Sequence, residues 1–145
     1  MPTTTRNKVL LRGEESDGAV STVESTMPAR APGPPLHSHE FDEAFYILDG
    51  DLTFQLGDER VIAAAGELVF APRGVPHTVA NLTDAPAAYL LVLTPAGFER
   101  EFARRAAKEA GVAPPEWALE PIPEVNYLGP RIVEQSVMAT HESVR

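Results

Sequence analysis

Short apolar segments, separated by turn-forming residues, constrain the fold of this chain more than any other feature. Between residues 43 and 94, glycine, proline and aspartate interrupt the apolar runs every several residues, and no helical pattern intervenes. The segment Asp49-Gly50-Asp51 is typical of a hairpin turn, and Gly57-Asp58 marks a second turn. Many short strands joined by tight turns favour antiparallel pairing. The pattern therefore predicts an all-β fold, a jelly-roll β-barrel.

The strands can be placed from alternation and from β-branched content. Residues 28–36 hold four prolines and a glycine, which exclude a helix or a central strand and predict a stiff, extended segment. The apolar run 44–48 predicts a strand covered on both faces. The expected strands are residues 8–12, 19–27, 43–49, 52–56, 60–65, 68–71, 77–81 and 87–94, with a further extended segment at residues 37–39.

One C-terminal α-helix is expected over residues 95–110, where the apolar period changes from 2 to 3.6. Thr94 is the expected N-cap, Pro95 the first helical residue and Gly111 the C-terminal stop. Apolar side chains at spacing i, i+4, i+8 form a stripe along this helix, which should dock on the outside of the barrel rather than bind a cofactor. Its members are Phe98, Phe102 and Ala106.

Composition bounds the class of protein. The chain has 145 residues, 43% hydrophobic and 23% charged, which is typical of one globular domain with its own core. A net charge of −9 argues against nucleic acid and anionic membrane surfaces as partners. No segment approaches the roughly 18 consecutive apolar residues of a membrane-spanning helix. With no cysteine and no visible secretory signal, we expect a cytoplasmic protein.

The residues that can carry chemistry gather between Pro34 and Asn81. His37 and His39 stand at i and i+2, so an extended strand would direct both imidazoles to one side. Glu43 has the same parity and can reach the same point if the chain bends near residues 41 and 42. His77 lies 34 residues further on, far enough for intervening strands to run out and return. These four residues are the predicted ligands of one metal ion.

Three imidazoles and one carboxylate suit a divalent first-row transition metal, namely iron, nickel, manganese, copper or zinc. A structural zinc site is less expected, because such sites are closed, four-coordinate and usually rich in cysteine. The alternative to a metal site is a set of polar or hydrogen-bonded core histidines. A lone His-x-His would favour that alternative, but Glu43 and His77 at matching spacing favour metal binding. The fourth histidine, His141, is given no role.

Two motifs resemble those of the cupin superfamily. The first cupin motif, Gly-x5-His-x-His-x3-Glu-x6-Gly, matches at the three ligands and at Gly50, although Ala31 stands where its leading glycine is expected. The second, Gly-x5-Pro-x-Gly-x2-His-x3-Asn, matches at all five defined positions: Gly66, Pro72, Gly74, His77 and Asn81. The chain thus resembles a single-domain bacterial cupin. The string Thr94 to Glu99 is also similar to the junction of cupins likened to quercetinases, a weaker resemblance.

The resemblance implies a cupin barrel, or double-stranded β-helix, in one domain over residues 1–145. Its metal-binding core would span residues 29–94. Its helix would span residues 95–110, and a C-terminal extension would span residues 112–145. Within the extension, Trp117 and Tyr127 would cover the barrel mouth, lie at a dimer surface or simply pack. The habit of the family implies a homodimer. The sequon at Asn81 is interpreted as chance, because no signal peptide is visible.

The first functional hypothesis is a metal-dependent dioxygenase acting on a small oxygen-rich or aromatic substrate inside the barrel. Glu43 would double as a general base, which the family resemblance suggests. The alternatives are a non-oxidative isomerase, lyase or cyclase with the same ligands, and a non-catalytic cupin that binds a small ligand. Under the first hypothesis the chain is an enzyme of the oxidoreductase class. The expected pocket walls are Phe45, Ile47, Phe54, Phe70, Val79, Tyr89 and Leu91.

Overall fold

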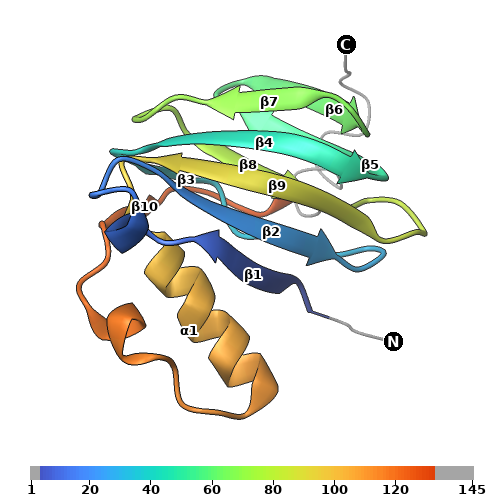
Figure 1. Cartoon of the computed structure of the whole chain (residues 1–145). Helices are drawn as coiled ribbons and strands as arrows, with labels where there is room; N and C mark the ends of the chain where they lie inside the picture. The colour runs from blue at the N-terminus through green and yellow to red at the C-terminus, as the bar shows by residue number, and fades with distance from the viewer. Residues whose placement is uncertain (1–3, 133–145) are drawn as a thin grey trace.

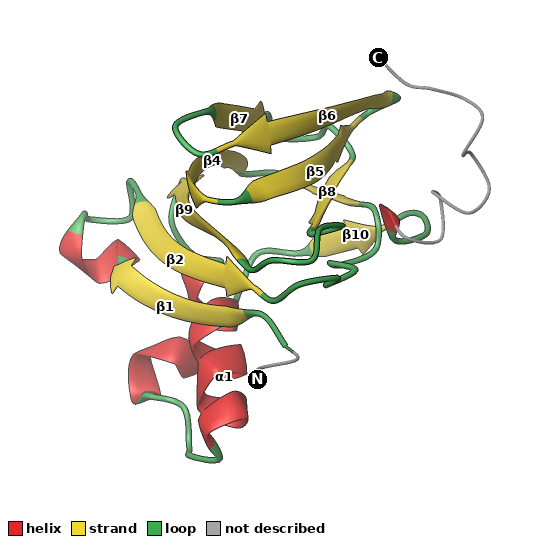
Figure 2. Cartoon of the chain, turned by 90° about the vertical axis from the view of Figure 1, so that its right-hand side faces the viewer, coloured by secondary structure: helices red, strands yellow, loops and turns green. Residues whose placement is uncertain are grey.

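Ten strands form two five-stranded antiparallel sheets in residues 4–132, the part of the chain that this computed structural model describes. Figures 1 and 2 show the sheets facing each other, with one helix below them. The first sheet runs in the order β1 (Arg6–Leu11), β2 (Ser21–Met27), β9 (Ala87–Thr94), β4 (Asp42–Asp49) and β7 (Leu68–Ala71). The second runs β10 (Val125–Tyr127), β3 (His37–His39), β8 (His77–Ala80), β5 (Asp51–Leu56) and β6 (Glu59–Ala64). The predicted all-β jelly roll is confirmed.

The hydrophobic core lies between the two sheets. Burial along β9 alternates strictly, with Tyr89, Leu91 and Leu93 facing inward as the sequence predicts. From the second sheet, Leu52 and Phe54 of β5 meet them, each 1% exposed. With this alternation, every second side chain faces the opposite sheet. These side chains exclude water from the space between the two sheets.

The outer face of β4 is exposed, so the prediction that both of its faces are covered is wrong. Phe45 and Ile47 point into the core, whereas Tyr46 and Leu48 are 42% and 43% exposed. On the neighbouring strand β7, Leu68 pairs with Tyr46 and is exposed, as is Phe70. The apolar run 44–48 therefore reflects an apolar outer strip as well as the core. The homodimer expected from the sequence stays a prediction.

The single α-helix, α1 (Glu99–Ala110), begins later than predicted. Thr94 cannot cap it, because Thr94 is the last residue of β9 and pairs with Asp42. Phe98 occupies the N-cap position instead. Gly111 ends the helix in the left-handed conformation, with φ of 71°, as expected for a glycine there. Among residues 4–132, no helix is both long enough and apolar enough to cross a membrane.

Glu99 fastens α1 to the barrel. Its buried carboxylate accepts hydrogen bonds from the backbone N–H of Gly13 and of Gly97. Gly13 begins a short 3-10 helix, η1 (Gly13–Glu15), in the connection between β1 and β2. The helix packs on these two strands, and Phe98 and Phe102 of the predicted stripe are buried. Ala106 is only half-buried, and the helix instead buries Ala103 and Ala107.

The segment after α1 returns to the second sheet. It forms a 3-10 helix, η2 (Glu116–Leu119), and then β10, whose three residues pair with the three residues of β3. The sheets therefore extend beyond the expected core of residues 29–94 on both sides. Trp117 lies under the guanidinium of Arg12, at 5.1 Å from the ring centroid. Residues 133–145 of the expected C-terminal extension, with His141, lie outside the described residues.

Asn81 closes the loop after β8 and should be essential for stability. It is fully buried; its amide donates to the carbonyls of Met27, Pro28 and Ala85, and its carbonyl oxygen accepts from Thr83. We expect Asn81→Ala to cost about 3 kcal/mol or more, because it leaves several buried polar groups without partners. Urea unfolding measures this. Asn126→Ala, at an exposed position of β10, is the control, and an equal loss in both variants would contradict the prediction.

Candidate metal centre

The four predicted ligands come from both sheets. His37 and His39 lie on β3 and His77 on β8 of the second sheet, whereas Glu43 lies on β4 of the first. The bend expected near residues 41 and 42 is the point where the chain crosses from one sheet to the other. His37 and His77 are cross-strand partners, and their ring centroids are 4.6 Å apart. The site is therefore held by pairing within one sheet and closed by a carboxylate from the other.

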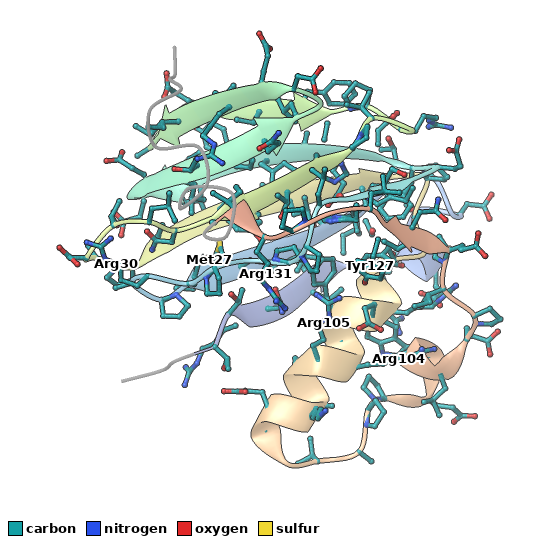
Figure 3. All side chains as sticks on the ribbon, turned by 180° about the vertical axis from the view of Figure 1, so that it is seen from behind. Met27, Arg30, Arg104, Arg105, Tyr127 and Arg131 are labelled. Atoms are coloured by element: carbon teal, nitrogen blue, oxygen red, sulfur yellow. The ribbon has the colours of Figure 1, made fainter. Side chains whose placement is uncertain are left out.

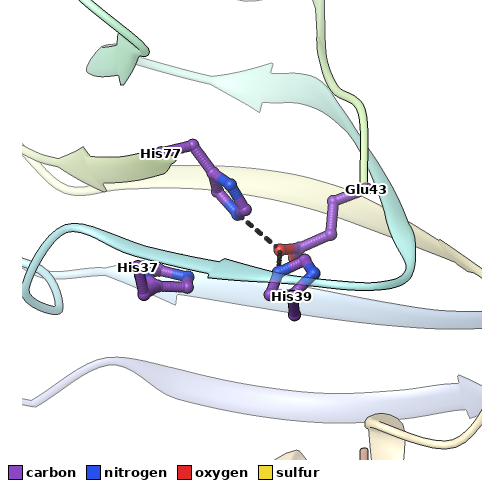
Figure 4. A group of neighbouring side chains, drawn as sticks. All are labelled: His37, His39, Glu43 and His77. Atoms are coloured by element: carbon purple, nitrogen blue, oxygen red, sulfur yellow. Dashed lines mark hydrogen bonds and ion pairs between the residues drawn. The ribbon is translucent and has the colours of Figure 1, made fainter. Parts of the chain in front are cut away.

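The ligand atoms converge on one point. One atom from each of the four side chains lies within 4.8 Å of all the others. Glu43 Oε1 is 2.7 Å from His39 Nε2 and 2.8 Å from His77 Nε2, and Figure 4 shows these two imidazoles meeting at this oxygen. His39, His77 and Glu43 are at most 5% exposed, while His37 is half-buried. Three ligands are thus shielded from water, and the fourth faces an opening.

Backbone carbonyls set the orientation of all three imidazoles. In each histidine the Nδ1 atom lies 2.7–2.9 Å from a carbonyl oxygen two residues away along the chain. A carbonyl only accepts, so Nδ1 carries a proton and donates it. This fixes the tautomer in which Nε2 presents its lone pair to a metal. The acceptors are Pro35 for His37, Phe41 for His39 and Val75 for His77.

The shared oxygen of Glu43 controls the charges in the site. Burial raises the pKa of Glu43, but the hydrogen bonds from His39 and His77 outweigh burial and lower the pKa to about 2. For His77, burial lowers the pKa, and the hydrogen bond and charge of Glu43 raise it above its ordinary value. Glu43 is therefore a carboxylate at neutral pH, and it favours the protonated form of the histidine beside it.

His37 behaves in the opposite way. Burial, followed by the positive charge of His77, lowers its pKa from 6.5 to about 4. Its imidazole is therefore neutral at pH 7, which is the form that binds a metal. The half-buried position of His37 places this neutral ligand on the accessible side of the cluster.

The donor set fits a divalent transition metal. In metal-free protein, His39 and His77 can contact a carboxylate through Nε2 only by donating a proton, since a carboxylate has none to give. A cation at the same point would replace those protons and accept the same lone pairs. Metal–nitrogen bonds of about 2 Å place neighbouring ligand atoms about 3 Å apart, close to the separations found here. Within the described residues, the cluster could therefore hold one ion with little rearrangement.

Packing around the ligands restricts their movement. The ring of His39 stacks on Phe41, with centroids 3.6 Å apart and planes at 2°, and Phe41 stacks in turn on Phe98 of the segment before α1. Gly33 lies so close to the Val79 carbonyl that a Cβ atom there would sit 1.7 Å from the oxygen, so only glycine fits. These contacts hold the metal ligands in place before a metal binds.

The cluster opens into a cavity of about 530 Å³, within the range of small-molecule sites. Of the seven expected wall residues, four line it: Phe45, Val79, Tyr89 and Leu91. Phe70 was wrongly assigned, because β7 turns this side chain outward, and it is 50% exposed. Ile47 and Phe54 face inward but lie in the packed core rather than at the cavity.

Several cavity residues were not foreseen in the sequence. Phe98 and Phe102 of the helical stripe line it, so the stripe forms a wall of the cavity in addition to docking on the barrel. Tyr127, for which the sequence left a place at the barrel mouth, at a dimer surface or in simple packing, lines the cavity beside His37, at 6.0 Å between ring centroids. Arg105 and Arg131 complete this side. No local motif predicts them, although the β-branched and aromatic residues of 125–127 are a weak strand signal.

Replacing His77 should remove the metal and keep the fold. Loss of one of four ligands costs bound metal directly, while the sheet pairing of β8 does not depend on the side chain. We expect His77→Ala, purified without a tag, to lose most of the metal found by elemental mass spectrometry in the wild type. His141→Ala is the matched control and should keep it. A full metal complement in His77→Ala would refute the ligand assignment.

The metal-free protein should lose stability as the pH falls from about 6.5 towards 4. Folded His37 has the lower pKa, so in this window the unfolded chain binds more protons and acid favours unfolding. Between pH 7 and pH 5 the contribution is at most about 2 kcal/mol. Urea unfolding of wild type and His37→Asn at both pH values isolates it. The same pH dependence in both proteins would contradict the assignment.

Comparison with known proteins identifies the fold. A family model described as a cupin domain matches residues 23–93. The crystal structure of TT1209 from Thermus thermophilus is similar with a TM-score of 0.57 and 26% identity, over 66% of this chain and 87% of that one. A predicted oxalate decarboxylase from Thermotoga maritima is similar in fold, with a TM-score of 0.60 and 24% identity over 63% and 80%.

A third similar structure is the DMSP lyase DddQ from Ruegeria pomeroyi. The TM-score is 0.54 at 26% identity, over 63% of this chain and 47% of that one. No curated protein matches the chain at a significant level. The family model covers all four clustered residues, and the solved structures share the barrel around them. The chain belongs to the cupin family and is a single cupin domain with a candidate metal site at His37, His39, Glu43 and His77.

Proposed function

We propose that this cupin is a metal-dependent enzyme, a dioxygenase that acts on a small oxygen-rich or aromatic substrate. One observation carries the proposal: three imidazoles and a carboxylate converge beside a cavity of about 530 Å³ that is open on one side. Three of the four ligands line that cavity, namely His37, Glu43 and His77. A substrate that fills the cavity would therefore contact the metal centre directly.

The metal would supply a Lewis acid and a template that orients oxygen atoms of the substrate and dioxygen. The residues of the chain itself would position the substrate and exchange protons with it. Glu43 is ionised at neutral pH and lines the cavity. With His39 and His77 bound to a metal, the hydrogen bonds that lower the pKa of Glu43 would be lost, so its carboxylate could then accept a proton from a substrate hydroxyl.

The cavity walls favour a flat or apolar substrate body. Phe45 and Tyr89 pack with ring centroids 5.5 Å apart, and Val79 and Leu91 complete an apolar surface that excludes water. Burial raises the pKa of Tyr89 to about 12, so its hydroxyl stays protonated at neutral pH, where it bonds with Ser25. The aromatic and aliphatic walls support a substrate with an aromatic or apolar body.

A non-oxidative reaction is the second candidate. Two of the similar structures are described as a predicted oxalate decarboxylase and a DMSP lyase, and neither name denotes a dioxygenase. The same residues would serve: Glu43 would remove a proton from carbon, and the cluster would hold the substrate oxygen that takes up the negative charge. Zinc or another redox-inert metal would suffice for this chemistry. A cupin that binds a small ligand without turnover is the third possibility.

Metal content and oxygen consumption on one preparation distinguish these candidates. Untagged protein, purified without added metal, would be measured by elemental mass spectrometry. Oxygen uptake would then be followed on flavonols and other enediol-like compounds. We expect near-stoichiometric iron, nickel, manganese or copper and uptake that depends on substrate. The Glu43→Gln variant should lose at least about a hundredfold in rate, as expected for a general base.

The other outcomes assign the protein differently. Zinc with no oxygen uptake would overturn the dioxygenase proposal in favour of an isomerase, lyase or cyclase. Absence of metal from both wild type and metal-reconstituted protein would overturn the enzyme proposal and leave a ligand-binding cupin. Glu43→Ala separates the role of the base from that of the ligand, because it should lose metal where Glu43→Gln retains part of it.

A further inference from the structure

Two arginines line the cavity on the side of α1 and of the segment after β10. Arg105 belongs to α1 and Arg131 to the segment after β10, and both line the cavity together with His37. Figure 3 shows the two in the same region, between α1 and the strands above it. They lie far apart in the sequence and are brought together only by the return of the chain to β3. Neither is a metal ligand, and the proposed reaction assigns neither a role.

Arg131 is held in place by the backbone. Its Nε donates to the Gly33 carbonyl at 2.9 Å, and among residues 4–132 no carboxylate forms an ion pair with it. The segment that carries it is fixed by backbone bonds, from Leu128 to Leu36 and from Leu36 to Pro130. The terminal nitrogens of a guanidinium present a planar fork that matches a carboxylate or phosphate. Arg131 therefore offers a positioned site for an anion.

Arg105 is partly neutralised and plays the smaller part. Its Nε lies 2.8 Å from Glu101 Oε2, and its guanidinium stacks over the ring of Phe102 at 5.3 Å. Glu109 also lines the cavity, where its carboxylate accepts a hydrogen bond from Thr4. The two arginines are therefore accompanied by two carboxylates, Glu101 and Glu109, and Glu101 is the ion-pair partner of Arg105. Arg131 is the cation at this part of the cavity for which the described residues provide no ion pair.

We propose that the cavity binds a small molecule with a carboxylate at one end, held by Arg131 with help from Arg105. The apolar body lies against Phe45, Tyr89 and Phe98, and the other end reaches the metal ligands. This inference rests on the proposed function, because it names the substrate class of the same site. An anionic end at the opening orients the substrate, so that its reactive end is directed to His37, His77 and Glu43.

The test compares acids with their neutral amides. The probes are benzoate, phenylacetate, 3-phenylpropanoate and 4-phenylbutanoate, each paired with its primary amide, so that the length of the spacer is scanned. Binding to metal-free and to zinc-loaded protein is measured by calorimetry. We expect at least one acid to bind about tenfold to a hundredfold more tightly than its amide, the usual effect of a hydrogen bond to a charged group.

Amino-acid substitutions show which residue causes the preference for acids over amides. Arg131→Ala should abolish the preference for the acid and leave amide binding unchanged, and Arg131→Lys should restore it in part. Arg105→Ala should weaken it severalfold. Lys108→Ala removes the same charge from the same helix without touching the cavity, and it should bind like the wild type.

Two results would overturn the inference: acids that bind no better than amides in the wild type, and a preference that survives in both Arg131→Ala and Arg105→Ala. Metal content and turnover are read separately on the same proteins. A protein that prefers acids but lacks metal would refute the proposed function alone. One that binds metal and turns over neutral compounds without preference for acids would refute only the substrate class.

Discussion

The buried carboxylate of Glu43 is the constraint on which the rest of this structure depends. An ionised group inside a barrel is costly unless it is paired, and here two imidazoles from the opposite sheet supply the pairing. Because Glu43 comes from the first sheet and the histidines from the second, the two sheets must keep their relative position for the charge to be satisfied. The hydrogen bonds that each Nδ1 donates to a backbone carbonyl then leave Nε2 as the only ring nitrogen that can meet the carboxylate.

Aromatic side chains connect the cluster to the segment that leads into α1. His39 rests on Phe41 and Phe41 on Phe98, so the orientation of one ligand depends on the segment that leads into α1. Glu99, the next residue, is anchored by backbone amides of the β1–β2 connection and of Gly97. The helix, which is outside the barrel, is therefore coupled through two stacked rings and one buried carboxylate to the clustered histidines and glutamate inside it.

The sequence was sufficient for the fold and for the four clustered residues, since both depend on local spacing. Alternation predicts strands, and the two motifs fix histidines and a glutamate at defined distances along them. Assignments failed where a side chain had to be assigned to a face without knowledge of its neighbours. Phe70 points outward because the register of β7 on β4 decides its parity. The role of Arg131 was invisible, because it depends on three residues of β10 pairing with β3, and such a short strand has little pattern of its own.

The return of the chain to β3 has a consequence for how this protein could diversify. All the clustered ligands lie between residues 37 and 77, whereas the helix-side and opening walls of the cavity are contributed by residues after 97. The cluster and this part of the cavity wall are thus encoded in separate stretches of the polypeptide. Exchanging the C-terminal stretch for that of another cupin would nevertheless affect both, because Phe98 in this stretch stacks on Phe41, which carries the ring of His39. A change in the shape of the cavity at this end of the chain would therefore also alter the geometry of the cluster.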